Sequence, residues 1–344
     1  MLKTKLSIVI GLLAALSLVV TPVAYAAEGQ TGGSFGAAAS TPEVTAVNIY
    51  APTDPNCTGA AITDMTPQVE WYYIKVSVTS NSKLKHLQTV RATLFYNDGS
   101  HPNAPLSADV HDAAILTWDA TAGFSSSFGG TTWGFNSGGC QAPANLEATS
   151  GNWIFSFRPG KVARENAVGK WDVQGYAENK TDGKNGNAYT RDKNMMWYGE
   201  IEVNTPSVDW GEVPLGLTFE TDAGNGNPQT GIQVNYLANG NYYEDVNSSE
   251  NWTGQTSSEI VRLDNGGGNP PSDPSEFALM GNDTSENTTA VIVQTSFNHI
   301  NNTGDMTEEA GVDKNANTLW LSLSATGITP DTYDGTIHYQ IENR

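Results

Sequence analysis

The chain has 344 residues, with 17 Lys and Arg against 37 Asp and Glu, a formal net charge of −20 and 38% apolar residues. A strongly acidic chain repels phosphate backbones and anionic lipid headgroups, so this balance excludes a nucleic-acid or membrane-surface binder and favours cations as small partners. The length predicts about two domains. The 9 Trp, 13 Tyr and 10 Phe can supply burial that the aliphatic residues do not.

The first 26 residues have the pattern of a secretory signal peptide. Two lysines precede an apolar run over residues 6–20, and Ala24 and Ala26 are the small residues of a cleavage site. We expect an exported chain that starts at Ala27 and is secreted or held at the extracellular cell surface. The apolar run is short for a spanning helix, so we expect no membrane span after cleavage, with an uncleaved anchor as the alternative.

The two cysteines, Cys57 and Cys140, are both in the first half of the chain. Outside the cytosol two thiols tend to oxidise, so we predict a disulfide that closes a loop of about 83 residues. Two free thiols or a metal site are the alternatives. No CxxC or His-x-x-x-His spacing accompanies either cysteine, which disfavours the metal site.

Residues 27–41 are small and polar and cannot bury enough surface to order themselves, so we interpret them as a flexible linker. Period-two alternation then predicts seven short strands, at residues 44–50, 69–78, 87–96, 113–118, 153–157, 170–177 and 195–203. Turn residues separate these strands. This pattern fits an antiparallel immunoglobulin-like sandwich over residues 42–204, with the predicted disulfide inside it.

The charge balance changes near residue 204. Residues 41–204 carry 12 Lys and Arg against 16 Asp and Glu, whereas residues 205–344 carry 3 against 20. We therefore predict a second, acidic β-sandwich over residues 205–344, with strands at 208–210, 217–219, 231–237, 259–263, 290–297, 318–323 and 335–341. The expected fold class is all-β: two immunoglobulin-like antiparallel β-sandwich domains in tandem after a signal peptide.

Several segments resemble modules of known surface proteins. The first half carries LKHLQTV at 84–90, TLFY at 93–96 and GKWDV at 169–173, and the second half carries VDWGEVPLG at 208–216 and GITPDTYDGTI at 327–337. The segments of the first half are similar to the immunoglobulin-like modules of prokaryotic, especially archaeal, cell-surface proteins, and those of the second half resemble another β-sandwich module of surface proteins. The resemblance implies a role in envelope architecture or adhesion without a catalytic site. Trp171, on a predicted strand, also suits the centre of a sandwich core.

Motifs of nucleophilic, metalloprotease and nucleotide chemistry do not occur in the sequence, so we expect no enzyme and name no catalytic residue. Asp109, His111 and Asp112, with nearby His101, form the one local group of transition-metal ligand types. A polar loop beside a strand is the alternative interpretation.

No cofactor is expected to be required, and calcium is the one ion that the turns suggest. Hard oxygen ligands gather in two Asn- and Gly-rich turns, at Asp182 and Asn185 and at Asp222, Asn225 and Asn227. Neither turn fits the twelve-residue EF-hand loop, and Lys184 occupies a ligand position in the first turn. Turn chemistry alone also explains these residues.

Two surface features bear on glycans. Seven Asn-x-Ser/Thr sequons occur, about two more than chance predicts, and five of them fall in a stretch that we interpret as exposed loop. The sequon residues are Asn56, Asn179, Asn247, Asn251, Asn282, Asn287 and Asn301. Aromatic side chains flanked by amides could instead stack on sugar rings; the candidates are Trp133, Tyr242, Tyr243 and Trp252.

These observations predict a secreted cell-surface protein with a structural or adhesive, non-catalytic role in the cell envelope. A secreted carbohydrate-binding protein is the first alternative. The second is a subunit of an extracellular filament, in which residues 27–41 would pair with an edge strand of a neighbour. The expected partners are other envelope or surface proteins, or glycans, and self-association is also open.

Overall fold

The computed structural model describes residues 34, 40–99, 103–166, 169–216, 230–268, 270–282, 290–307 and 315–344. Regular structure in these ranges is strand, apart from two 3-10 turns, η1 (Leu84–His86) and η2 (Ser137–Gly139), so the predicted all-β class is confirmed. Within the same ranges, no helix has the length and apolar character that a bilayer crossing requires. The predicted signal peptide, residues 1–26, lies outside the described residues.

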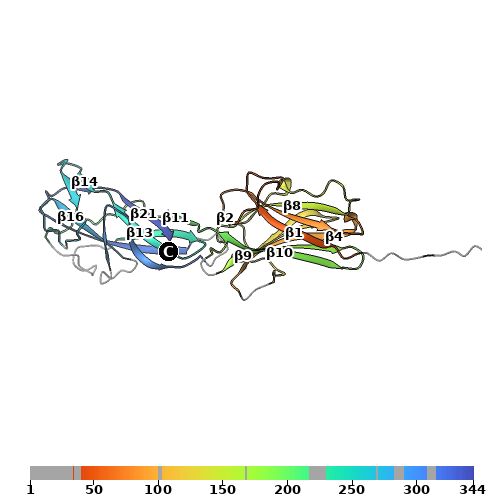
Figure 1. The fold of residues 1–344 in the computed structure, drawn as a ribbon. Helices are drawn as coiled ribbons and strands as arrows, with labels where there is room; N and C mark the ends of the chain where they lie inside the picture. The colour runs from red at the N-terminus through yellow and green to blue at the C-terminus, as the bar shows by residue number, and fades with distance from the viewer. Residues whose placement is uncertain are drawn as a thin grey trace, which may run out of the picture. The chain divides into compact units, whose positions relative to one another are not determined.

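Two sheets form the first sandwich (Figure 1). One sheet is antiparallel, in the order β1 (Glu43–Tyr50), β3 (Tyr72–Thr79), β8 (Ser150–Arg158) and β7 (Gly134–Phe135). The other sheet has the order β2 (Asp64–Met65), β10 (Asn185–Met195), β9 (Lys170–Asn179), β4 (Leu87–Asn97), β5 (Ala113–Asp119) and β6 (Gly123–Phe128), with β2 parallel to β10.

Alternation along the strands builds the first core. Burial alternates strictly along β3, and Ile74 and Val76 are completely buried. Trp171 of β9 and Trp153 of β8 are also completely buried, so the expectation that Trp171 lies in a sandwich core is confirmed. Each such side chain contributes about 1.5–3 kcal/mol of hydrophobic stabilisation relative to an exposed one.

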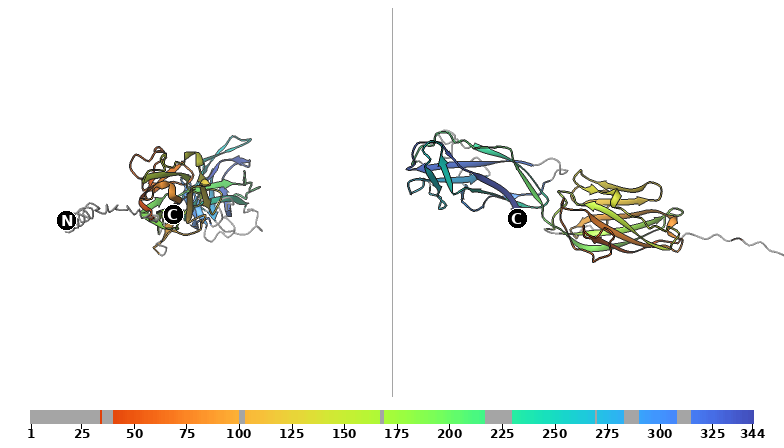
Figure 2. Two further views of the ribbon diagram at one scale, coloured as in Figure 1. Left: turned by 90° about the vertical axis from the view of Figure 1, so that its right-hand side faces the viewer. Right: turned by 90° about the horizontal axis from the view of Figure 1, so that it is seen from above.

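The C-terminal part of the chain also forms two sheets (Figure 2). The larger sheet has the order β11 (Gly199–Val203), β12 (Thr230–Ala238), β19 (Asn315–Thr326), β16 (Glu276–Asn282), β15 (Ile260–Leu263), β14 (Asn251–Gly254) and β20 (Tyr333–Asp334), and β17 (Val291–Val293) also pairs with β16. The smaller sheet places β13 (Tyr242–Ser248) between β18 (Asn298–Gly304) and β21 (Ile337–Asn343).

Trp252 lies at the centre of the second core. Its ring packs 4.7 Å from Phe277 and 5.9 Å from Trp210, measured between ring centroids. Gly335 allows this packing, because a Cβ atom there would lie 2.0 Å from Trp252 Cδ1. The glycine within the segment 327–337 therefore has a packing reason in addition to its turn chemistry.

The predicted boundary at residue 204 is wrong by one strand. Residues 195–203 were expected to form the last strand of the first sandwich, but β10 ends at Met195 and a new strand, β11, begins at Gly199. β11 pairs with β12 along its whole length, so it belongs to the second sandwich. Alternation predicts that a segment is a strand, whereas its hydrogen-bond partner decides which sheet it joins.

Several strand predictions in the acidic half also need correction. Residues 208–210 are not a strand; Trp210 instead reaches the core from an irregular segment, and its Nε1 donates to Leu321 O at 3.2 Å. Residues 217–219 lie outside the described residues, and only Val291–Val293 of the predicted strand 290–297 is regular. Strands β13, β14, β16 and β18 of this half were missed, because none of them shows a regular alternation of apolar and polar residues.

Candidate functional site

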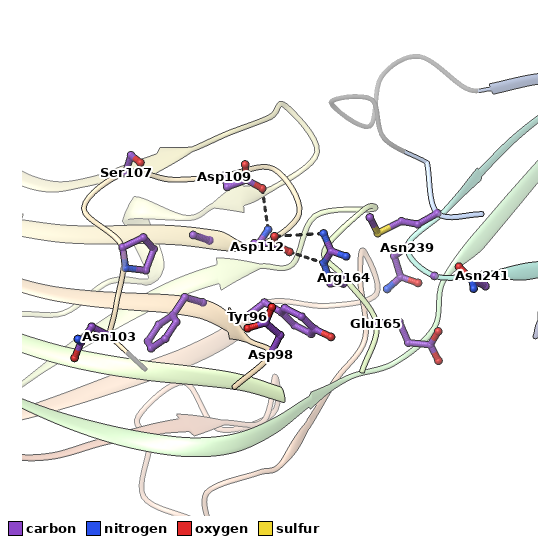
Figure 3. A pocket seen from close by; sticks show the side chains of 15 residues that line it. Tyr96, Asp98, Asn103, Ser107, Asp109, Asp112, Arg164, Glu165, Asn239 and Asn241 are labelled. Carbon is purple, nitrogen blue, oxygen red and sulfur yellow. Dashed lines mark hydrogen bonds and ion pairs between the residues drawn. The ribbon is translucent and has the colours of Figure 1, made fainter. Parts of the chain in front are cut away.

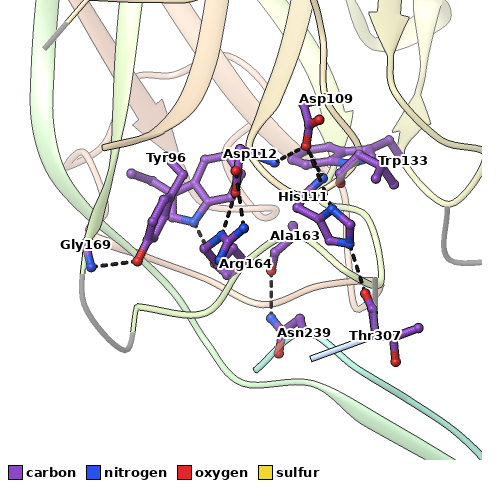
Figure 4. Close-up of polar contacts among 12 residues, drawn as sticks. Tyr96, Asp109, His111, Asp112, Trp133, Ala163, Arg164, Gly169, Asn239 and Thr307 are labelled. Carbon is purple, nitrogen blue, oxygen red and sulfur yellow. Dashed lines mark hydrogen bonds and ion pairs between the residues drawn. The ribbon is translucent and has the colours of Figure 1, made fainter. Parts of the chain in front are cut away.

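A buried asparagine, Asn239, joins the two sandwiches (Figure 4). It follows β12 and is completely buried. Its Nδ2 donates to Ala163 O at 2.8 Å and to Met196 O at 3.0 Å, and its Oδ1 accepts from Tyr198 N at 2.7 Å. Its backbone bonds as well, since Glu165 N donates to Asn239 O at 2.9 Å. One side chain therefore satisfies one backbone group in the loop between β8 and β9 and two in the connection between β10 and β11.

A second buried contact at this junction involves His111 (Figure 4). Its Nε2 lies 2.9 Å from the carbonyl oxygen of Thr307, a residue that is itself completely buried. The three described members of the group predicted around His111 have the contacts of a polar loop: Asp109 caps backbone N–H groups of its own turn, and Asp112 pairs with Arg164 at 2.7 Å. His101, the fourth member, lies outside the described residues.

A pocket of about 700 Å³ opens beside this junction (Figure 3). Its wall carries four carboxylates, and Arg164 is the cation among its lining residues. The Arg164 guanidinium lies 5.3 Å from the centroid of the Tyr96 ring and is paired with Asp112. Arg164 therefore neutralises part of the negative charge of the pocket wall.

Glu165 is the pocket carboxylate with a perturbed titration. Burial raises its pKa, and a hydrogen bond from Asn343 Nδ2 at 2.9 Å opposes that rise. A Cβ atom at neighbouring Gly240 would come within 2.2 Å of Glu165 Oε2, so the backbone of the second sandwich lies directly against this carboxylate. Through these contacts Glu165 stabilises the junction between the two sandwiches.

The predicted disulfide is not formed. Cys57 and Cys140 are both free thiols, so the free-thiol alternative describes the structure. Cys57 packs on Ile154, whereas the Cys140 thiol donates to Asn136 O at 3.4 Å and accepts from Ser156 N at 3.2 Å. Burial raises the pKa of Cys57 to about 12 and that of Cys140 to about 11, which keeps the oxidisable thiolate scarce.

Three of the four predicted sugar-stacking aromatics are core residues, and their assignment is wrong. Trp133 is 4% exposed and stacks on Phe128, Trp252 lies in the second core, and Tyr242 is completely buried. Only Tyr243 is partly exposed, and its ring stacks on His299 at 4.1 Å. Neighbours on a strand face opposite sides of the sheet, which separates Tyr243 from Tyr242.

The sequons divide by burial. Asn56 and Asn251 are exposed, but Asn179 and Asn282 are 1% and 2% exposed, which leaves no room for a glycan on the folded chain. The Nδ2 of Asn179 also donates to Ser40 O.

The remaining sequons correct the expectation of an exposed loop. Asn247 is half-buried on β13, and Asn301 lies on β18 opposite Glu244. Asn287 lies outside the described residues. The stretch from Asn247 to Asn301 thus contains four complete strands and parts of two others in addition to its loops.

The first predicted calcium turn already has a cation beside its carboxylate. Lys184 Nζ lies 2.9 Å from Asp182 Oδ2, and hydrogen bonding from Lys184 lowers the pKa of Asp182. Asn185 points its Nδ2 at Gly183 O, 3.3 Å away, which is turn chemistry rather than ion binding. The second turn, with Asp222, Asn225 and Asn227, lies outside the described residues.

The three-stranded sheet gathers a group of metal-ligand types that the sequence did not reveal. Asp245, His299 and Glu342 bring their ligand atoms within 4.8 Å of one another, the one such trio found in the described ranges. His299 Nδ1 contacts Asp245 Oδ1, and His299 Nε2 lies 3.8 Å from Glu342 Oε1. The available signal was the alternation of polar residues along β21, which places His338, Gln340 and Glu342 on one face, whereas β13 carries polar residues on both faces and gave no such signal.

Comparison with known proteins gives little further guidance. No protein-family model matches the chain, and no curated protein matches it. One solved structure, from work on the chaperone–tip adhesin complex of CFA/I fimbriae biogenesis, is similar over 88% of this chain and 91% of that chain, with 10% sequence identity and a TM-score of 0.24. A similarity at this level carries no conclusion about function.

Proposed function

We propose that the chain is a secreted cell-surface protein of a prokaryotic, archaeal-type envelope, with a structural or adhesive role and no catalytic activity. Its partners are other envelope or surface proteins or glycans, and copies of the chain itself. The proposal rests on the sequence resemblance, the all-β fold and, above all, the junction around Asn239.

The junction favours a structural role for a physical reason. Two independent binding modules need only a flexible linker between them. Here the completely buried amide of Asn239 donates to Ala163 O, and the carbonyl oxygen of buried Thr307 lies within hydrogen-bond distance of His111 Nε2. Both contacts join the two sandwiches. Such contacts hold two domains at a fixed spacing, because each buried polar group is satisfied only while the junction is closed. A fixed spacing is useful in a protein that bridges two surfaces.

The acidic second half suggests how the chain associates. Residues 205–344 carry 3 basic and 20 acidic residues, so copies repel one another unless cations screen or bridge them. Extracellular calcium sites bind with dissociation constants of about 0.1–1 mM, which is the concentration range in which such bridging is expected.

Light scattering and envelope binding test the proposal. The chain from residue 27 to residue 344 would be run on size-exclusion chromatography with light scattering, first in chelator and then in about 1 mM calcium. It would also be sedimented with isolated prokaryotic envelopes. Calcium-dependent growth or co-sedimentation supports the proposal, and Asn239→Ala should weaken co-sedimentation while the exposed Asn241→Ala leaves it unchanged. A monomer that stays in the supernatant under both conditions contradicts it.

Carbohydrate binding is the second candidate, and one surface favours it. On the outer face of the six-stranded sheet, Arg91 lies over the Tyr176 ring at 4.6 Å and Arg191 over the Tyr189 ring at 4.9 Å. Gln174 Nε2 donates to the Tyr189 hydroxyl at 2.6 Å. Aromatic rings beside amide and guanidinium donors suit sugar hydroxyls. Glycan-array binding that Tyr176→Ala and Tyr189→Ala both remove would support this role, and an array without signal would contradict it.

A further inference from the structure

We propose that His299 and Glu342 bind a divalent transition-metal ion, with Asp245 as the residue that orients the histidine. This site lies on the three-stranded sheet, and its three residues belong neither to the lining of the pocket nor to the two predicted calcium turns. The protein ligands are one imidazole nitrogen and one carboxylate oxygen, and water completes the coordination shell.

Strand pairing brings the three side chains to one face of the sheet. β13 lies between β18 and β21, with Asp245 opposite His299 on one side and opposite Gln340 on the other. Tyr243, two residues before Asp245 and therefore on the same face, pairs with Glu342. The ligand types thus come from three strands that are distant in sequence.

The surroundings of His299 fix both its tautomer and its ring plane. The Asp245 side chain is 1% exposed, and its Oδ1 accepts the Nδ1 hydrogen of His299, while its Oδ2 accepts from Gln340 Nε2 at 3.1 Å. The Tyr243 ring stacks on the imidazole at 4.1 Å with an interplanar angle of 21°. A hydrogen on Nδ1 leaves the Nε2 lone pair free. A histidine held by a buried carboxylate in this way is the common arrangement at metal sites.

His299 Nε2 faces the Glu342 carboxylate. The distance between these two groups is close to that between two ligands of one metal ion. His299 Nε2 and Glu342 Oε1 are 3.8 Å apart. Two ligands at about 2.0–2.1 Å from a tetrahedral ion lie about 3.4 Å apart, so the pair must close by about 0.4 Å. Glu342 is 49% exposed and close to the end of β21, so its side chain can make this movement.

The ligand chemistry selects the ion class. Imidazole with carboxylate suits Zn²⁺, Cu²⁺ or Ni²⁺, whereas Ca²⁺ takes only oxygen ligands. Acidic residues outnumber basic residues in the segment 205–344, and this negative charge raises the local concentration of any cation. With two protein ligands the affinity for the metal is modest. The informative measurements are therefore the differences in affinity between metals and between variants.

Titration of the chain from residue 27 to residue 344 with Zn²⁺, followed by isothermal calorimetry, tests the site. We expect His299→Ala to abolish the strongest binding event, Glu342→Gln to weaken it at least about tenfold, and Asp245→Asn to weaken it about 10–100-fold. His338→Ala is the matched control, because this exposed histidine lies on the same sheet two residues before Gln340. Ca²⁺ should not compete with Zn²⁺ at this site.

Electron paramagnetic resonance with Cu²⁺ gives a second readout, which reports on the ligand atoms rather than on the affinity. The wild-type chain should show hyperfine coupling to one imidazole nitrogen, which His299→Ala removes and His338→Ala retains. Circular dichroism confirms that each variant is folded. Unchanged Zn²⁺ affinity in a folded His299→Ala, equal losses in both histidine variants, or a Cu²⁺ spectrum without nitrogen coupling would each overturn the proposal.

Discussion

Replacing Asn239 with alanine tests whether the junction stabilises the whole chain. The substitution removes three hydrogen bonds, to Ala163 O, Met196 O and Tyr198 N. The bond to Ala163 is buried, so leaving that carbonyl unsatisfied costs about 1–3 kcal/mol. The other two bonds are partly buried and contribute about 0.5–1.5 kcal/mol each. The expected loss in the free energy of unfolding is therefore about 2–6 kcal/mol.

Urea unfolding measures this loss. Tryptophan fluorescence reports on both cores, because Trp153 and Trp171 lie in the first and Trp210 and Trp252 in the second. Far-UV circular dichroism provides an independent probe of the strands. If the junction couples the two cores, Asn239→Ala should lower the midpoint and separate the transitions of the two cores.

Asn241→Ala is the matched control for this experiment. It removes the same side chain two residues further along, at an exposed position beside the same pocket. An exposed substitution of this kind changes stability by no more than about 0.5 kcal/mol. If Asn239→Ala were as stable as Asn241→Ala, the buried amide would contribute nothing, and the argument for a fixed spacing would fail.

Three further predictions concern other parts of the chain. Cys57 and Cys140 should react only slowly with a thiol reagent in the native state, because burial raises the pKa of both thiols. After unfolding without reductant, the reagent should count two thiols per chain. A count of zero would refute the free-thiol assignment. Gly335→Ala should destabilise the second core by about 1–3 kcal/mol, since the new Cβ atom overlaps Trp252; an unchanged midpoint in urea would contradict this packing. Hydrogen bonds from a serine hydroxyl and backbone N–H groups hold the pKa of Asp331 below the ordinary value of an aspartate, about 3.9, so the stability it adds is present above about pH 4 and is lost as the pH falls. The difference in urea midpoint between wild type and Asp331→Asn should therefore shrink on acidification, and a constant difference would show that the carboxylate charge has no role.

Sequence patterns determined the elements whose signal is local. Alternation predicted β1, β4 and β9 to within about two residues, because a strand with one buried face repeats every second residue. The position of Trp171 in a core follows from the same alternation. The charge difference between the halves and the seven sequons can likewise be read from the residues alone, whereas export stays a prediction from the first 26 residues.

Burial of individual side chains required the tertiary structure. Tyr242 and Tyr243 are neighbours with similar surroundings in sequence, yet one is completely buried and the other stacks on His299. Alternation states that they face opposite sides, but only the partner sheet decides which side is the core. The same reason explains why Asn179 and Asn282 are buried sequons and why β11 joins the second sandwich.

The polar sites depend on contacts between distant segments. Asp245 and His299 are 54 residues apart in the chain and adjacent in the sheet, and His111 reaches a carbonyl 196 residues away. Composition and spacing therefore determined an acidic β protein and predicted its export. The register of β13 with its two neighbours and the closure of the junction decided which of its polar residues meet, because hydrogen bonds between strands follow three-dimensional pairing rather than sequence distance.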